Sequence, residues 1–151
     1  AWRPEALEAA ITGRTRFLLF AIEGGPRDPG AACTLPAMAW VDAPVANARV
    51  GGDFTVQGWA FKDGVGIERV EILLDGRVVA EATYGLPSPG VARYWKISTD
   101  PGHPDVGFSA KVALPPGSEG THWLGLRLHG RDGSVEDWSE QRIEASREAP
   151  R

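Results

Sequence analysis

The sequence is short of several features that would point to particular functions. It has one cysteine, Cys33, among 151 residues, so no disulfide can close within the chain and cysteine usage leaves the redox compartment open. Basic residues are not in excess, because 16 Lys and Arg stand against 20 Asp and Glu for a net charge of −4. The longest apolar run, residues 17–22, is far shorter than the roughly 20 residues that cross a bilayer. We therefore expect no nucleic-acid partner and no membrane insertion by this chain.

Motifs for catalysis, phosphate binding and metal binding are also lacking. His122 and His129 are seven residues apart in one expected strand, so their side chains leave opposite faces and cannot share a metal ion. His103 lies between Asp100 and Asp105, where an imidazole and two carboxylates could gather around a cation or act as a base. A polar loop stiffened by prolines is the favoured interpretation of that segment. No serine lies in a nucleophile elbow, so we expect no catalytic residue, no bound metal and no cofactor.

The chain is rich in turn-forming residues and still apolar enough to fold. Nineteen Gly and 12 Pro accompany a hydrophobic content of 42% and six Trp, which favours a turn-rich all-β domain over a disordered chain. Before that domain, residues 4–12 are expected to form a helix, residues 15–22 a strand and residues 24–36 a Gly- and Pro-rich connection. The boundary then divides an N-terminal appendage, residues 1–36, from a β domain, residues 37–151.

From about residue 38 the apolar residues recur with a period of two, which is the period of a β-strand. Small or apolar residues occupy the even positions from Phe54 to Ala60, so that face is expected to be buried, and Leu126 is expected in the core. Asp75 and Gly76 are typical of a type I′ hairpin turn. The expected strands are 53–61, 68–75, 77–84, 106–114, 121–130 and 138–145. Such short strands predict two antiparallel sheets packed as a β-sandwich, rather than one open sheet.

Two segments resemble the bacterial immunoglobulin-like (Big-type) modules of envelope and secreted proteins. They are GGDFTVQGWAFKDGVGIERVEILLDGRVVAEA, residues 51–82, and PPGSEGTHWLGLRLHGRDGSVEDW, residues 115–138. The match in strand and turn positions covers about residues 42–145, and only the connection at residues 85–105 is longer than in a compact module. The resemblance implies an immunoglobulin-like sandwich that is not an enzyme.

The same resemblance implies a role and a location. The domain would be an accessory module that spaces, stabilises or docks domains of a larger exported bacterial protein. Its partners would be other domains of that parent protein, or a separate protein. Its place would be extracytoplasmic, whether periplasmic, at the cell surface or secreted.

Aromatic residues of the expected strands suggest surfaces for protein contacts. The alternation places Trp59 and Phe61 on the outer side of one sheet, and Leu73 and Trp123 on the outer side of the other. The apolar run at residues 17–22 and the helix before it are expected to dock on the patch formed by Leu73 and Trp123. In the alternative interpretation, neighbouring segments or a missing parent domain cover these rings, and the N-terminal segment belongs to an interface with another domain or a second chain.

A second function is suggested by the long connection at residues 85–105. It contains Tyr94 and Trp95 side by side, with His103 and Asp105 shortly after them. Flat aromatic rings with polar edges are suited to stacking on sugar rings. These four residues therefore form a candidate glycan-binding site, and exposure of Trp95 is the observation that separates this function from that of a plain accessory module.

Overall fold

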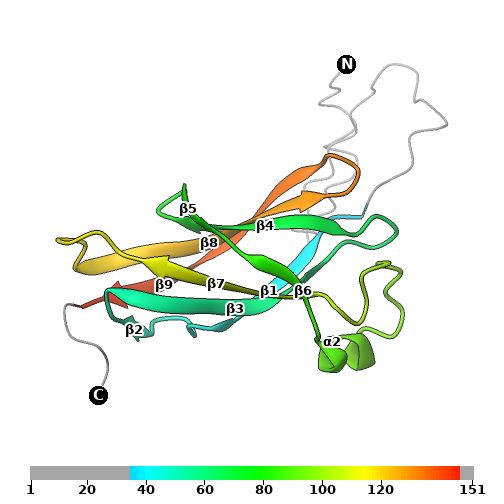
Figure 1. Ribbon diagram of the computed structural model, residues 1–151, viewed down its shortest axis with the longest axis horizontal. Coiled ribbons are helices and arrows are strands. Elements are labelled where there is room, and N and C mark those ends of the chain that lie inside the picture. The colour runs from blue at the N-terminus through cyan, green and yellow to red at the C-terminus, as the bar shows by residue number, and fades with distance from the viewer. Residues whose placement is uncertain (1–34, 147–151) are drawn as a thin grey trace, which may run out of the picture. The chain divides into compact units, whose positions relative to one another are not determined.

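The computed structural model describes residues 35–146. Nine strands and one short helix account for most of this range (Figure 1). In chain order they are β1 (Met38–Ala43), β2 (Arg49–Val50), β3 (Asp53–Phe61), β4 (Ile67–Leu74), β5 (Arg77–Glu81), β6 (Thr83–Leu86), α2 (Pro89–Tyr94), β7 (Gly107–Ala113), β8 (Gly120–Gly130) and β9 (Val135–Ala145). The N-terminal helix, the strand at residues 15–22, Cys33 and the docking expected of the N-terminal segment lie outside the described residues.

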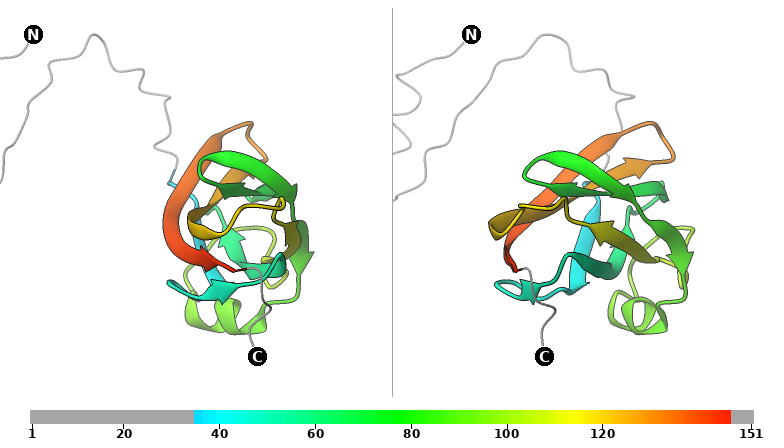
Figure 2. Two further views of the ribbon diagram at one scale, coloured as in Figure 1. Left: turned by 90° about the vertical axis from the view of Figure 1, so that its left-hand side faces the viewer. Right: turned by 60° about the vertical axis from the view of Figure 1, so that its left-hand side comes forward.

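The strands form two sheets that pack face to face (Figure 2). One sheet has four strands in the order β1-β3-β7-β6, and the other has five in the order β2-β9-β8-β4-β5. All neighbouring pairs are antiparallel except β2 with β9. The predicted immunoglobulin-like antiparallel β-sandwich is confirmed.

The core lies between the sheets and is built by the alternation read from the sequence. Val56 and Ala60 of β3 are fully buried, and Leu126 of β8 has no exposed surface. They pack in one cluster with residues from most of the other strands. The hairpin between β4 and β5 turns at Asp75 and Gly76, whose φ angles of 51° and 77° are the left-handed values that a type I′ turn requires.

The six predicted strands are right in position, but β1 and β2 were not among them, and one of the six needs correction. The single strand expected at 77–84 is two strands, because the chain leaves the five-stranded sheet after β5 and joins the four-stranded sheet as β6. Ala82 lies at the crossing and is buried, and its amide donates to the Val70 carbonyl at 2.9 Å. The same alternate residues face the core in β5 and in β6. The period of two in the sequence therefore continues past the point where the chain changes sheets.

The described chain begins and ends at opposite ends of the sandwich. Met38 pairs with Phe61 at one end, whereas Ala145 pairs with Gly120 at the other (Figure 1). Between them β8 runs for 11 residues, which corresponds to roughly 35 Å at the rise of an extended strand. The polypeptide therefore enters at one end of this domain and leaves at the far end.

Candidate binding surface

The outer face of the four-stranded sheet carries a cluster of aromatic rings. Trp59 and Phe61 alternate with the core residues of β3 and point away from the core, as expected. On the neighbouring strand β1, Trp40 lies directly opposite Trp59 and Met38 lies opposite Phe61. Trp40 is 60% exposed, whereas Trp59 is only partly exposed.

The long connection after β6 packs on this face with the helix α2, which lies outside the two sheets (Figure 2). The helix ends where the Trp95 amide donates to the Val91 carbonyl at 2.8 Å. The Trp95 ring then meets Phe61 edge-on at a centroid distance of 5.6 Å, and it lies 6.4 Å from Trp59. Phe61 also stacks on Trp59 at 5.6 Å with an angle of 14° between the rings. The connection therefore covers Phe61, which is 2% exposed and is not the surface residue that the strand pattern suggested.

A buried carboxylate holds the connection to the sheet. Asp100 is 5% exposed, and its two oxygens accept hydrogen bonds from the backbone amides of Lys62 and Gly102, each at 2.6 Å. Lys62 directly follows the last residue of β3, so these bonds fix the turn of the connection against the end of that strand. The Asp100 carboxylate thus serves as the acceptor for backbone amides rather than as a cation ligand beside His103.

A second set of bonds links Asp63 to the same turn. Its Oδ1 accepts from the Ser98 hydroxyl at 2.6 Å and from the Thr99 amide at 2.8 Å. His103 Nε2 lies 2.8 Å from the Ser98 Oγ, and its ring lies 5.2 Å from Phe61. His103 Nδ1 is buried and has no hydrogen-bond partner in the described structure. The histidine is thus part of the packing beneath the connection.

The structure brings together three of the four residues expected to hold a glycan. Tyr94 is 80% exposed, and its ring lies 5.3 Å from the half-buried ring of Trp95. The ring of His103 is partly buried and, like that of Trp95, lies against Phe61. Asp105 is exposed, and its amide donates to the Gly102 carbonyl at 2.7 Å, which turns the chain toward β7. Trp95, on which the choice between functions depended, is partly exposed, so this observation leaves both functions open.

The expected Leu73 and Trp123 patch needs correction. The two residues lie on neighbouring strands, β4 and β8, as predicted. Trp123 is 48% exposed, but Leu73 is only 2% exposed, and Gly125 lies opposite it on β8. Leu73 therefore offers no surface to a partner, and Trp123 is an isolated exposed ring on the five-stranded sheet.

Sequence reasoning missed Trp40, the most exposed tryptophan of the described chain. The signal was present, because Ala37, Ala39 and Val41 alternate with Met38 and Trp40. The odd positions of this segment pack on the core and the even positions point outward. Recognising this short strand would have placed a second tryptophan on the side of Trp59.

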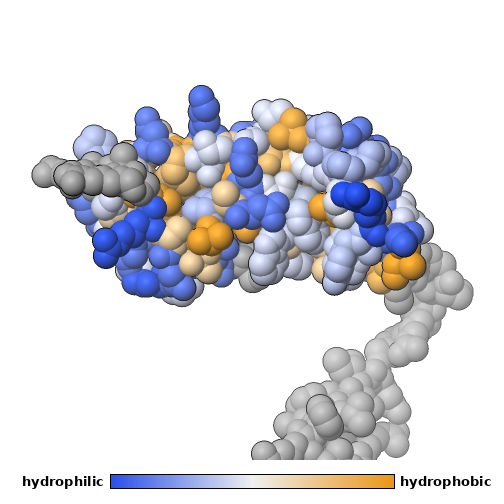
Figure 3. Space-filling model, turned by 90° about the horizontal axis from the view of Figure 1, so that it is seen from below, coloured by the Kyte–Doolittle hydropathy of each residue, from blue (hydrophilic) through white to orange (hydrophobic). Residues whose placement is uncertain are grey.

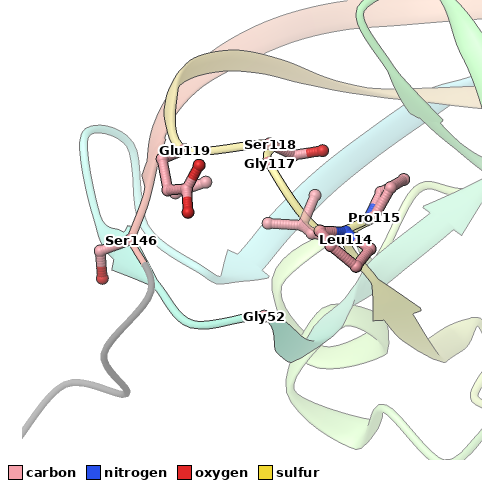
Figure 4. Close-up of a pocket in the computed structure, with 9 residues that line it drawn as sticks. Gly52, Leu114, Pro115, Gly117, Ser118, Glu119 and Ser146 are labelled. Atoms are coloured by element: carbon pink, nitrogen blue, oxygen red, sulfur yellow. The ribbon is translucent and has the colours of Figure 1, made fainter.

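The hollows on the surface of the described residues contain few side chains that could catalyse a reaction. One of about 230 Å³ lies beside Trp95 and is lined mainly by apolar residues, among them Met38, Phe61 and Ile97. Another of about 280 Å³ lies at the far end of the sandwich, between the loop from Leu114 to Glu119 and Ser146 (Figure 4). A more polar hollow of about 430 Å³ lies at the edge of the five-stranded sheet.

Arg69, Glu81 and His129, which line that third hollow, belong to a network of charged side chains that includes the neighbouring Glu71. Arg69 contacts Glu71 at 3.1 Å and Glu81 at 3.6 Å, and His129 Nε2 lies 2.8 Å from Glu71. The hydrogen bond from His129 lowers the pKa of Glu71, which keeps the carboxylate ionised. Residues 35–146 contain no group of three or more His, Cys, Asp and Glu side chains arranged to hold a metal ion. No helix in this part of the chain is long and apolar enough to cross a membrane.

Sequence comparison identifies the family that this fold resembles. Residues 37–89 match the bacterial Ig domain family. The match begins at β1 and runs through the two strands of the β4–β5 hairpin to the start of α2. It confirms the resemblance to Big-type modules for this part of the chain. No curated protein sequence matches the chain.

The chain is similar to several solved structures with which it shares little sequence identity. An endo-beta-1,4-mannanase from Thermotoga petrophila is 10% identical with a TM-score of 0.50, over 80% of this chain and 22% of the mannanase. The fibronectin(III)-like modules of CbhA from Clostridium thermocellum are 16% identical with a TM-score of 0.46, over 72% of this chain and 46% of that one. CopC from Methylosinus trichosporium is 15% identical with a TM-score of 0.38, over 72% of this chain and 94% of CopC. The match thus spans less than half of each of the first two proteins.

Proposed function

We propose that the domain is a non-catalytic accessory module that holds neighbouring parts of a larger exported bacterial protein at a fixed separation. The observation that carries this proposal is the path of the chain, which enters beside Phe61 and leaves beside Gly120 at the opposite end (Figure 1). Many domains have their termini close together. A domain with its ends apart instead keeps the segments joined to its two ends away from each other.

The connections between the two sheets make such a spacer stiff. Lys62 follows β3 in the four-stranded sheet, and its ammonium group donates to Glu136 of β9 in the other sheet at 2.7 Å. Glu136 also accepts from the amide of Ala37, just before β1, at 3.2 Å. The point at which the chain enters is therefore fixed to both sheets.

The comparisons support a role within a larger protein. The family match is to a bacterial Ig domain, and the mannanase contains a similar fold in only 22% of its length. Ser98 Oγ lies 2.8 Å from His103 Nε2, but the Ser98 hydroxyl donates to Asp63, so the imidazole is not placed to remove its proton as a hydrolase would need. The resemblance to modules of envelope and secreted proteins supports an extracytoplasmic location.

The proposal is tested by placing the 151-residue chain between two folded reporter domains and measuring their separation by small-angle X-ray scattering. The control replaces the chain with a Gly/Ser linker of the same length, which behaves as a flexible coil. We expect one narrow distribution of separations with the chain and a broad one with the linker. A distribution as broad as that of the linker, or turnover of aryl ester or aryl glycoside substrates by the purified chain, would contradict the proposal.

A further inference from the structure

The outer face of the four-stranded sheet carries a strip of aromatic rings that the spacer function does not use. It consists of Trp40 and Trp59 from the sheet and Trp95 and Tyr94 from the connection, and we call it the aromatic strip. Trp40 and Trp59 are cross-strand partners, Trp59 and Trp95 are 6.4 Å apart, and Trp95 and Tyr94 are 5.3 Å apart. Rings from two distant segments thus lie next to one another across the face.

The rings at the centre of the strip are held in place from below. Phe61 stacks on Trp59 and meets Trp95 edge-on, each at 5.6 Å, and is itself buried. Asp100 and Asp63 fix the connection that carries Trp95 through hydrogen bonds of 2.6 to 2.8 Å. A ligand that stacks on these rings would not have to order them first, which removes part of the entropy cost of binding.

The rings at the two ends of the aromatic strip, those of Trp40 and Tyr94, are exposed. Rings that only stabilised the core would instead be buried. Trp40 is 60% and Tyr94 is 80% exposed. Tyrosine and tryptophan combine a flat apolar face with an O–H or N–H donor at the edge. This combination matches a sugar ring, which has C–H groups on its faces and hydroxyl groups around its rim.

Hydrogen-bonding side chains lie next to the strip. Gln57 precedes Trp59 by two residues on the same face of β3, is exposed, and pairs across the strands with Ser109 of β7. Asp42 follows Trp40 by two residues and is also exposed. An amide, a hydroxyl and a carboxylate are the acceptors and donors that bind sugar hydroxyls.

Leu35 and Ile97 are also exposed beside Trp95, but the apolar surface on the side of the molecule where α2 lies is not continuous. Seen from below Figure 1, the side on which α2 lies, the hydrophobic areas are small and separated by pale and hydrophilic ones (Figure 3). A stable protein interface buries about 800 Å² on each partner around an apolar centre. Charges beside the strip are of both signs, with Arg93 and Lys96 flanking Tyr94 and Trp95, and Asp42 and Asp63 on the sheet side. Because positive and negative side chains both lie beside the strip, we expect an uncharged ligand.

We propose that the aromatic strip binds a neutral polysaccharide, with pyranose rings stacked on Trp40 and Tyr94 and in contact with the exposed parts of Trp59 and Trp95 between them. This binding is independent of the spacer function, because it uses the outer face of one sheet and not the two ends of the domain. A module could hold its neighbours apart and attach them to a glycan at the same time.

The test is affinity gel electrophoresis of the full chain in gels that contain konjac glucomannan, hydroxyethyl cellulose or wheat arabinoxylan, all uncharged, followed by titration calorimetry with the polysaccharide that retards it. We expect retardation in at least one gel. Trp40→Ala and Tyr94→Ala should each weaken binding at least tenfold, because truncation of a stacking ring removes its whole contact. Both positions are exposed, so the melting temperature should stay within a degree or two of that of the unchanged chain.

Trp123→Ala is the matched control, because it removes a half-exposed tryptophan from the other sheet. It should bind as tightly as the unchanged chain. The proposal is overturned if none of the three polysaccharides retards the chain, or if Trp123→Ala weakens binding as much as Trp40→Ala. It is also overturned if light scattering shows that the chain self-associates, that Trp40→Ala abolishes this association and that no glycan binds, since the strip would then be an interface between copies.

Discussion

His122 Nδ1 lies 2.6 Å from Asp75 Oδ2, and this contact ties the turn of the β4–β5 hairpin to the start of β8. The other ring nitrogen of His122 lies 2.9 Å from the Ser118 carbonyl oxygen. Both nitrogens therefore face acceptors, an arrangement that only the doubly protonated imidazolium can satisfy. The second Asp75 oxygen accepts from the Trp123 amide at 2.9 Å.

This pair predicts a stability window in pH. The hydrogen bond to Asp75, followed by that to Ser118, raises the pKa of His122 above 6.5. Burial works to raise the pKa of Asp75, but the bonds from His122 and Trp123 outweigh it and lower that pKa below 3.8. Stabilisation by His122 is complete below pH 6.5 and is lost as pH rises through its folded pKa, whereas that by Asp75 is complete above pH 3.8 and is lost as pH falls. The pair stabilises the fold most between these values.

The measurement is urea unfolding at a series of pH values. We expect the free energy of unfolding of the unchanged chain to fall as pH rises above 6.5, and Asp75→Asn to flatten this part of the curve. Asparagine is well suited to the positive φ of this turn position, so the hairpin should be retained. Asp137→Asn, which removes an exposed carboxylate bound to Arg127, is the control and should leave the slope in the same pH range unchanged. An identical slope in Asp75→Asn would contradict the assignment to this pair.

A second prediction concerns the ion pair between Lys62 and Glu136. Lys62 is 3% exposed and its ammonium group donates to Glu136 and to the Ser134 hydroxyl at 2.8 Å, whereas Glu136 is 32% exposed. Removing one partner of a buried ion pair costs about 3 to 5 kcal/mol. Because water reaches Glu136, we expect a smaller loss, about 2 kcal/mol, for Glu136→Gln, which leaves the buried ammonium without its counterion.

Lys62→Met should be less harmful than Glu136→Gln, since it removes the buried charge and leaves a carboxylate that water can solvate. Comparison of the two variants by chemical denaturation separates the effect of an unpaired buried charge from that of a lost contact. If Lys62→Met is the more destabilising of the two, the hydrogen bonds of the ammonium group to Glu136 and Ser134 contribute more to stability than an unpaired buried charge costs.

The strand pattern was predictable from the sequence, because burial between two sheets imposes a period of two. The core face of β3 and the position of Leu126 followed directly from that period, and the Asp75–Gly76 turn followed from its φ requirement. The outward residues were less predictable. Phe61 and Leu73 both point away from the core and are nevertheless buried, since the cover over the outer face of a strand depends on contacts distant in sequence.

The candidate site shows the same limit. Tyr94, Trp95 and His103 were found because aromatic and polar residues crowd one long connection. The contact between Trp95 and Trp59 depends on where that connection packs. Asp100 determines this position through its hydrogen bonds to two backbone amides. The spacing of apolar residues along a strand gives no information about such hydrogen bonds.

A third prediction tests the close approach of β1 to β3. Gly58 lies where a Cβ atom would collide with the Trp40 carbonyl oxygen and come within 2.8 Å of the Phe108 ring. Gly58→Ala should therefore displace β1 and cost about 3 kcal/mol, at the upper end of the range for overpacking. The free energy of unfolding and the tryptophan emission should both change. Gly52→Ala, where a Cβ would meet nothing within 4 Å, is the control and should stay within about 0.5 kcal/mol of the unchanged chain.

The last prediction links the buried carboxylate of Asp100 to the aromatic strip. Asp100→Ala would leave the amides of Lys62 and Gly102 without their acceptor, and each unsatisfied buried donor costs about 1 to 3 kcal/mol. We expect a loss of about 3 kcal/mol in global stability, or a smaller loss together with local opening of the connection at residues 85–105. Limited proteolysis followed by mass spectrometry distinguishes the two results, because local opening would unfold the backbone around the exposed Arg93 and Lys96 and let trypsin cleave there.

Asp63→Ala is the matched comparison, since Asp63 accepts hydrogen bonds from Ser98 and Thr99 of the same turn but is itself partly exposed. Water can replace its bonds, so the loss should be about 1 kcal/mol. If Asp100 positions Trp95 over Phe61, its replacement should also red-shift the tryptophan emission, because the half-buried Trp95 ring would become exposed to water. Equal effects of Asp63→Ala and Asp100→Ala on both proteolysis and emission would show that the burial of Asp100 has no special part in holding the connection.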